Sequence, residues 1–210
     1  MIDGTCAKCH KTVSIYKVNS HLNNCTLGDK TGTNHRSFIL RIEDLDVQRY
    51  WMYLKMSETA TLDDLDKFLR NIWLECCGHL SEFNINGRRY ERQSEFCEGS
   101  LDTKIKAKEI LEKGLMFSHT YDFGSSTNLQ ITIHGEYHDN TKPKNNIEIL
   151  MRNNQIEQKC KLCGKKAELI CAECYYDEEI FLCESCEDKH GGHVVSGIVN
   201  SPRMGVCGYE

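Results

Sequence analysis

The chain has 210 residues, with 26 Lys and Arg against 31 Asp and Glu, and a formal net charge of −5 at pH 7. Because a nucleic-acid-binding protein usually presents a basic surface, this balance disfavours nucleic acid as the main partner. The sequence shows no signal peptide and no apolar run long enough to cross a membrane, so we expect a cytoplasmic protein. In that compartment most of the 13 cysteines should be reduced or bound to metal rather than paired in disulfides.

A four-ligand zinc signature opens the chain. Two cysteines with two residues between them are followed, eleven residues later, by the pattern H-x3-C. Zn²⁺ prefers four tetrahedral sulfur or nitrogen ligands, and one turn that holds two cysteines supplies two of them. We therefore expect a zinc finger over residues 1–28, with the last two ligands on a short helix. The predicted ligands are Cys6, Cys9, His21 and Cys25.

The run NSHLNNCTL at 19–27 resembles the UBZ-type (ubiquitin-binding) fingers, which read close to N-x-H-L-D-x-C-x-L. Asn23 stands at the position of the Asp with which that family recognises ubiquitin. The resemblance therefore implies a bound metal and a turn-helix shape, but not ubiquitin binding.

Residues 36–138 are poor in cysteine and predict the larger folding unit. Alternating apolar residues indicate a strand over 38–42, and β-forming residues indicate a second strand over 47–54. Thr61 is a favourable N-cap for a helix over 61–73, whose apolar residues repeat at helical spacing. The remaining predicted elements are a strand at 79–84, a turn at Asn86-Gly87, a helix over 102–113 ending at Gly114, and a hairpin of 116–121 with 129–137.

The predicted fold class is an α+β core, a mixed sheet with two helices, flanked by two small zinc-binding modules. A linker at 29–35 has turn-forming residues and no apolar period. A connector at 139–158 is expected to become helical from residue 146.

Four short motifs of the core recur together in one known family. In order they are TLDDL at 61–65, HLSEF at 79–83, GRRY at 87–90 and YDFG at 121–124. With this order and spacing, residues 36–138 resemble the plasmid pRi ORF-three-like family, whose members are often labelled TnpR-like. The resemblance implies an α+β fold and no established reaction. No serine or tyrosine recombinase constellation accompanies it.

Eight potential metal ligands lie within 34 residues near the C-terminus. Three C-x2-C pairs are followed by an H-x2-H pair, which makes two complete four-ligand sites with no open position for water. We expect cross-braced wiring, in which the first and third pairs share one zinc and the second and fourth share the other; sequential wiring remains the alternative. The predicted ligands are Cys160, Cys163, Cys171, Cys174, Cys183, Cys186, His190 and His193. Their spacing over 159–200 resembles B-box zinc fingers, and that resemblance implies protein partners or self-association.

Candidates for catalysis are few. His79, His119 and Asp122 would converge if the YDFG turn lies near a helix end, although a capping role for Asp122 is the more common one. Cys76, Cys77 and Cys97 are expected in the core, with a fourth metal site from Cys76, His79 and Cys97 as an alternative. Cys207, in the tail, has no partner that the sequence identifies.

Three functions follow from these features, in order of preference. The first is a non-enzymatic adaptor that holds three structural Zn²⁺ ions and binds protein partners through its terminal zinc modules. The second is a DNA- or RNA-associated factor, related to ribosomes or mobile elements, that binds through the basic N-terminal finger and the Arg88-Arg89 hairpin. The third is an enzyme centred on Cys76, His79 or Asp122.

Overall fold

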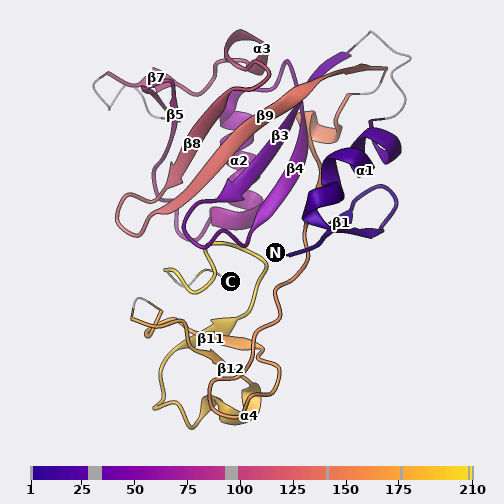
Figure 1. Ribbon diagram of the computed structural model, residues 1–210. Helices are drawn as coiled ribbons and strands as arrows, with labels where there is room; N and C mark the ends of the chain where they lie inside the picture. The colour runs from indigo at the N-terminus through magenta and orange to yellow at the C-terminus, as the bar shows by residue number, and fades with distance from the viewer. Residues whose placement is uncertain are drawn as a thin grey trace.

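The computed structural model describes residues 2–27, 35–92, 99–140, 142–175, 177–207 and 209. Among them, ten strands form one sheet in the order β2-β1-β10-β4-β3-β9-β8-β5-β6-β7, and three form a small sheet in the order β12-β11-β13. The described strands pair antiparallel except for β6 with β7, so the large sheet is mixed. Figure 1 shows the large sheet above and the small sheet below, with the C-terminus between them.

The strands of the large sheet are β1 (Gly4–Cys6), β2 (Thr12–Val13), β3 (His35–Asp44), β4 (Trp51–Ser57), β5 (Ser81–Ile85), β6 (Arg88–Glu91), β7 (Leu101–Asp102), β8 (Met116–Tyr121), β9 (Thr127–Asp139) and β10 (Ile147–Asn153). The small sheet consists of β11 (Leu169–Cys171), β12 (Phe181–Leu182) and β13 (Val195–Gly197). The helical segments are η1 (Ile15–Lys17), α1 (Val18–Cys25), α2 (Leu62–Leu69), η2 (Arg70–Leu74), α3 (Ala107–Ile110), η4 (Lys144–Asn146) and α4 (Glu184–Glu187).

Both faces of the central strands are covered. On β4, Met52 and Leu54 pack in the core that contains α2, whereas the alternate residues Trp51 and Tyr53 pack against the N-terminal finger. This alternation follows from the two-residue period of a strand. Burial on both faces explains why every residue of β4 is buried.

Helix α2 begins where the sequence predicts. Thr61 Oγ1 accepts a hydrogen bond from the backbone N–H of Asp64 at 3.1 Å, and Asp64 Oδ2 accepts one from the N–H of Thr61 at 2.9 Å. This reciprocal capping box satisfies two N–H groups that have no partner within the helix. The helix continues as the π-helical turn η2, which places Trp73 in the core with no exposed surface.

The predicted hairpins are also present. Asn86 and Gly87 connect β5 to β6 with φ angles of 52° and 78°, the left-handed conformation that a type I′ turn requires. Strands β8 and β9 pair over Met116–Tyr121. The strand predicted over 47–54 begins later, at Trp51, because the Asp44 carboxylate accepts hydrogen bonds from backbone N–H groups of the preceding turn.

The helix predicted over 102–113 is wrong for most of its length. Its beginning forms β7, and the carbonyls of Thr103 and Ile105 accept hydrogen bonds from Asp63 and Leu62 at the start of α2. Because the backbone is used in these tertiary contacts, only Ala107–Ile110 is helical.

The connector also differs from the prediction. From Ile147 it forms strand β10, which lies between β1 and β4 and buries Leu150 and Met151. No helix follows it among the described residues of the predicted connector. The two-helix core is therefore an incomplete description: the sheet is larger, because the finger contributes β1 and β2 and the connector contributes β10.

The C-terminal tail folds back onto the large sheet. Trp73 Nε1 donates to the carbonyl of Asn200 at 3.1 Å, and Ser201 Oγ donates to the carbonyl of Trp73 at 2.6 Å. Asn153 Nδ2 donates to Asn200 Oδ1, and Asn200 Nδ2 donates to the backbone carbonyl of Asn153. Residues 201–206 are all buried, so this tail is part of the contact between core and module. None of the described helices has the length and apolar character needed to cross a bilayer.

Candidate metal centres

The N-terminal finger gathers its four predicted ligands. The ligand atoms of Cys6, Cys9, His21 and Cys25 all lie within 4.8 Å of one another. Cys6 ends strand β1, Cys9 lies in the following turn, and α1 carries the other two ligands at positions i and i+4, which share one face of a helix. Strand β1 pairs with β10, so the ligand turn is anchored to the large sheet.

The electrostatics of this cluster favour a thiolate at Cys6. Burial alone would raise the pKa of Cys6, but hydrogen bonds from the backbone of Cys9 and from His21 outweigh it and lower the pKa to about 6. The thiolate is the form that ligates metal.

The C-terminal module gathers its ligands in the cross-braced grouping. The atoms of Cys160, Cys163, Cys183 and Cys186 form one cluster within 4.8 Å, and those of Cys171, Cys174, His190 and His193 form another. Strand β11 ends at Cys171, and Cys183 precedes α4, which contains Cys186. Because Leu169 pairs with Leu182 and Ile170 with Phe181, Cys171 and Cys183 lie at opposite ends of the β11–β12 pair. Whether these residues ligate zinc remains a prediction.

In the four-cysteine cluster of the module, the close packing of the thiols gives them different pKa values. Backbone N–H groups of Cys183 and Cys163 outweigh burial and lower the pKa of Cys160 to about 6, whereas burial and the neighbouring thiols raise the pKa of Cys186 to about 12. Thiolates this close repel one another unless a cation lies between them. The arrangement therefore suits a divalent metal ion.

The separations within the clusters match a tetrahedral centre. Cys9 Sγ lies 3.5 Å from His21 Nε2, Cys163 Sγ lies 3.6 Å from Cys183 Sγ, and Cys174 Sγ lies 3.5 Å from His190 Nε2. Tetrahedral Zn–S and Zn–N bonds separate ligand atoms by about 3.5–3.8 Å. The donor sets, S₃N, S₄ and S₂N₂, are those of structural zinc sites.

The predicted meeting of His79, His119 and Asp122 occurs only in part. His79 Nε2 lies 3.6 Å from Asp122 Oδ2, but His119, in β8, has no exposed surface and is paired elsewhere. Its Nε2 lies 2.8 Å from Asp66 Oδ1.

Asp66 is the centre of a buried polar network. Its Oδ1 also accepts from Ser81 Oγ at 2.6 Å, and its Oδ2 accepts from Arg70 Nε at 2.7 Å. Burial alone would raise the pKa of Asp66, but the hydrogen bonds from His119 and Ser81 and the charge of Arg70 hold it well below the usual range. The network ties α2 to β5 and β8, and its burial makes it a structural feature.

Asp122 is paired with the C-terminal tail. Arg203 Nη2 donates to Asp122 Oδ2 at 2.7 Å, and Arg203 Nη1 donates to the carbonyl of Ser125 at 2.9 Å. The guanidinium also lies over the ring of Tyr121, 4.7 Å from its centroid. Asp122, a catalytic candidate in the sequence, is therefore engaged in an ion pair with Arg203, a residue that the sequence did not indicate as functional.

A fourth cluster differs in composition from the fourth metal site that the sequence predicted as an alternative. Cys76 and His79 lie together as predicted, but their neighbours are Cys77 and Cys207; Cys97, the predicted third ligand, is outside the described residues. All four ligand atoms lie within 4.8 Å of one another. The local pattern C-C-x-H was the available signal, whereas the fourth ligand comes from the far end of the chain. The part of the chain that the structure describes thus has four Cys/His clusters able to hold a metal ion.

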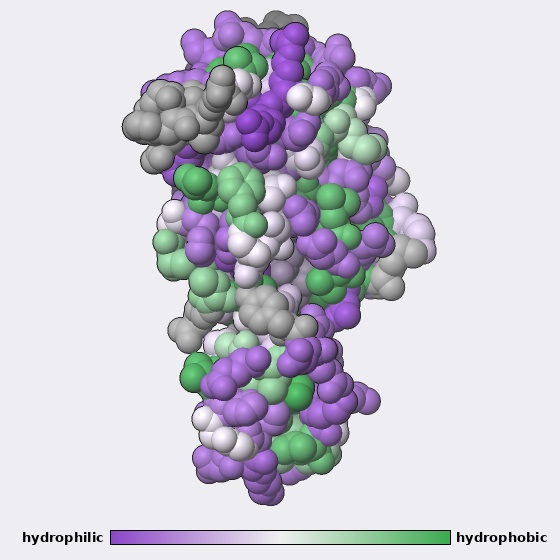
Figure 2. All heavy atoms as spheres, turned by 90° about the vertical axis from the view of Figure 1, so that its left-hand side faces the viewer, coloured by the Kyte–Doolittle hydropathy of each residue, from purple (hydrophilic) through white to green (hydrophobic). Residues whose placement is uncertain are grey.

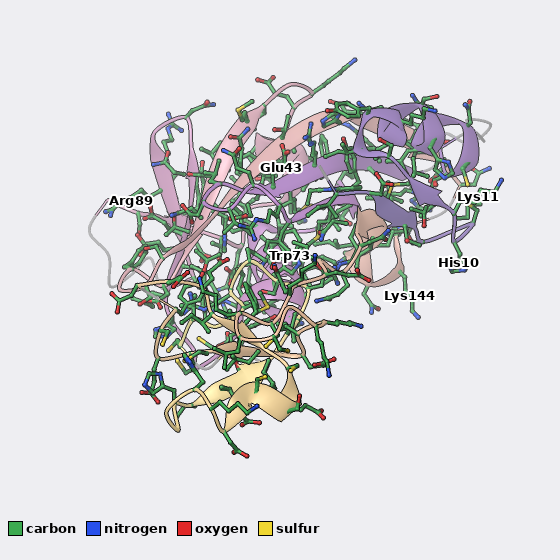
Figure 3. The ribbon with its side chains drawn as sticks, turned by 60° about the horizontal axis from the view of Figure 1, so that its bottom comes forward. His10, Lys11, Glu43, Trp73, Arg89 and Lys144 are labelled. Carbon is green, nitrogen blue, oxygen red and sulfur yellow. The ribbon has the colours of Figure 1, made fainter. Side chains whose placement is uncertain are left out.

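The two basic elements lie at opposite edges of the large sheet. The finger forms one edge with β2, and Arg88 and Arg89 begin β6, next to the other edge. Figure 3 shows Arg89 on one side of the molecule and His10 and Lys11 on the other. Eight strand spacings separate them, roughly 38 Å along the sheet. They do not form one basic surface.

Comparison with known proteins identifies the core. No curated protein matches the chain. Among solved structures, it is similar to the crystal structure of a protein of unknown function, MM3350, from Methanosarcina mazei Go1. The two share 16% identity and a TM-score of 0.48, over 57% of this chain and 68% of that one. The family described as plasmid pRiA4b ORF-3-like protein matches residues 38–167, a range that omits the finger and most of the C-terminal module. Since this match covers more than half of the chain, the protein belongs to the plasmid pRiA4b ORF-3-like family.

Proposed function

We propose that this protein is a non-enzymatic, cytoplasmic adaptor that holds structural zinc in three centres and binds protein partners through its terminal modules. The observation that supports the proposal is that each of the three predicted clusters brings together four side chains that could ligate a metal ion. A zinc ion with four protein ligands has no open position for a water nucleophile, so its role is structural.

Exposed apolar side chains next to the ligands support binding to proteins. Tyr16 in the finger is 76% exposed. In the module, Leu162 lies between two ligands and is 51% exposed, and Val194 follows the last ligand and is 64% exposed. Apolar and aromatic anchors of this kind provide much of the binding energy at protein interfaces. Apolar side chains interrupt the hydrophilic surface of the lower lobe, which contains the module (Figure 2).

The polar groups that resemble catalytic machinery are already engaged. His119 and Asp66 are buried and bonded to each other, and Asp122 is paired with Arg203. A catalytic acid or base must reach the substrate within hydrogen-bond distance. These contacts support a scaffold role for the core.

The charge distribution favours protein over nucleic acid. The finger and the Arg88-Arg89 hairpin lie too far apart to form one basic footprint, and Arg89 faces Glu91 at 4.0 Å. The net charge of −5 adds to this argument.

The test begins with metal-replete protein purified without a metal-binding tag and treated with nuclease. Partner proteins retained on the immobilised wild type are identified by mass spectrometry and compared with those on a Leu162→Ser/Val194→Ser variant. The matched control is Leu45→Ser, which removes an apolar side chain that is 40% exposed but distant from the ligands in sequence. We expect the double variant to keep its metal and lose partners that the control retains.

Two outcomes would overturn the proposal. One is an identical partner set for the double variant and the wild type, combined with no loss from Tyr16→Ser. The other is retention of RNA or DNA, without nuclease, that weakens steeply as salt rises, since release of counterions from nucleic acid has this signature.

A further inference from the structure

The fourth cluster joins the core to the C-terminal tail. The loop after η2 supplies Cys76, Cys77 and His79, and the tail supplies Cys207. We propose that these four residues bind a further zinc ion, which fastens the tail to the core. The site is separate from the three centres of the proposed adaptor and does not depend on that function.

The spacing of the ligand atoms fits a tetrahedral metal. Cys77 Sγ lies 3.6 Å from the Sγ atoms of both Cys76 and Cys207, and His79 Nε2 lies 3.5 Å from Cys207 Sγ. These values match the separation of about 3.5–3.8 Å expected around zinc. The contact of His79 Nε2 with Cys77 Sγ, at 2.9 Å, has to lengthen when the ion enters. An S₃N donor set selects zinc over magnesium or calcium, which prefer oxygen ligands.

The loop that carries three ligands is held in place by other contacts. The backbone N–H groups of Cys76 and His79 donate to Tyr121 Oη at 3.4 and 3.3 Å. The N–H of Gly78, where φ is +79°, donates to Glu75 Oε1 at 2.5 Å. Tyr121 Oη in turn donates to Glu75 at 3.0 Å. A ligand loop supported in this way binds metal at a lower entropic cost than a free one.

Arg203 stabilises the negative charge that such a site carries. Its Nε and Nη2 each lie 3.4 Å from Cys76 Sγ. Three thiolates and one Zn²⁺ leave a net negative charge, and the guanidinium, which also pairs with Asp122, stabilises this charge by donating to one sulfur. Contacts of this kind around the ligands tune the affinity of metal centres.

The tail reaches the site because it is packed between the core and the C-terminal module. Arg203 has no exposed surface and contacts Asp122 and Thr127 of the core, whereas Met204 packs against Ile170 and Phe181 of the module. Cys207 follows at the exposed end of this packed segment, 130 residues after Cys77. A metal bond at this point would close the tail over the core.

Native mass spectrometry of anaerobically purified full-length protein tests the site. We expect four zinc ions per wild-type chain and three in both Cys207→Ser and His79→Ala. His10→Ala is the matched control, because His10 is exposed and belongs to none of the clusters, and it should retain four. Circular dichroism checks that each variant is folded.

The counts separate this proposal from the three-centre one. Equal counts in wild type and Cys207→Ser would overturn the fourth site. A wild-type chain two hydrogens lighter, with three ions, would do the same by showing a disulfide, such as one between Cys77 and Cys207. A fall from three ions to two in Cys207→Ser would support the fourth site and remove one of the other three.

Trypsin measures the fastening directly. Cleavage after Arg203 requires this buried residue to leave the core, so we expect it several-fold faster in Cys207→Ser than in the wild type or His10→Ala. Equal cleavage rates would overturn the fastening role.

Discussion

Arg203 and Asp122, which are 81 residues apart in sequence, form a buried ion pair at 2.7 Å. The pair is surrounded by further contacts: the guanidinium donates to Thr127 Oγ1 at 3.1 Å and covers the ring of Tyr121. Arg70 covers the same ring at 4.7 Å. The tail is therefore bound by a specific polar contact as well as by apolar packing. The contribution of the polar contact can be tested by mutation.

Replacing Arg203 should destabilise the protein strongly. Arg203→Ala leaves the Asp122 carboxylate without its cation, and loss of one partner of a buried ion pair costs about 3 kcal/mol or more. Urea unfolding followed by circular dichroism measures the change. Arg88→Ala, at an exposed position, is the control and should change the free energy of unfolding little. Similar urea midpoints for both variants would show that the ion pair makes no net contribution to the free energy of unfolding.

Stability should also depend on pH through Asp66. The pKa of this carboxyl is depressed in the folded state, so its contribution is present above the unfolded value, near 3.9, and is lost as pH falls through the folded one. We expect the stability difference between wild type and Asp66→Asn to narrow as the pH falls below about 4. Comparing the two proteins at each pH cancels the loss of metal that both undergo in acid. A gap of constant size down to pH 3 would contradict this assignment.

The docking of the finger can be tested at Gly4. A Cβ at this position would lie 2.3 Å from Trp51 Cη2 and 2.6 Å from the carbonyl oxygen of Arg152. Gly4→Ala should therefore cost about 1–3 kcal/mol through overpacking. Gly135→Ala is the matched control, because a Cβ there meets nothing within 4 Å. Chemical denaturation monitored by tryptophan fluorescence gives both values, and equal stabilities would mean that the finger is not packed against β4 as described.

The capping box of α2 predicts a smaller effect. Thr61→Ala removes the oxygen that accepts from Asp64 N–H, and we expect a loss of about 1 kcal/mol. Thr61→Ser keeps that oxygen and should recover most of the loss. If Thr61→Ser is as unstable as Thr61→Ala, the methyl group of Thr61 rather than its hydroxyl is responsible. The readout is the urea midpoint, with an unchanged slope showing that the unfolded states are comparable.

Features with a local physical cause could be predicted from the order of the amino acids alone. The C-x2-C spacings at Cys6 and Cys160 place two ligands in one turn, Thr61 caps its own helix, and Asn86-Gly87 has the backbone freedom that a tight hairpin needs. These features require no knowledge of the rest of the chain, and the structure contains all of them.

Features that depend on residues far apart in the sequence became visible only in the folded chain. Residues 147–153 form a strand because β1 and β4 provide hydrogen bonds on both sides. The local sequence does not indicate these partners. Cys207 acquires its neighbours through the packing of Arg203 on Asp122, across a loop of more than a hundred residues. Short-range spacing specifies a ligand pair, but only the folded chain brings together groups this far apart, because their contact is the sum of all the packing between them.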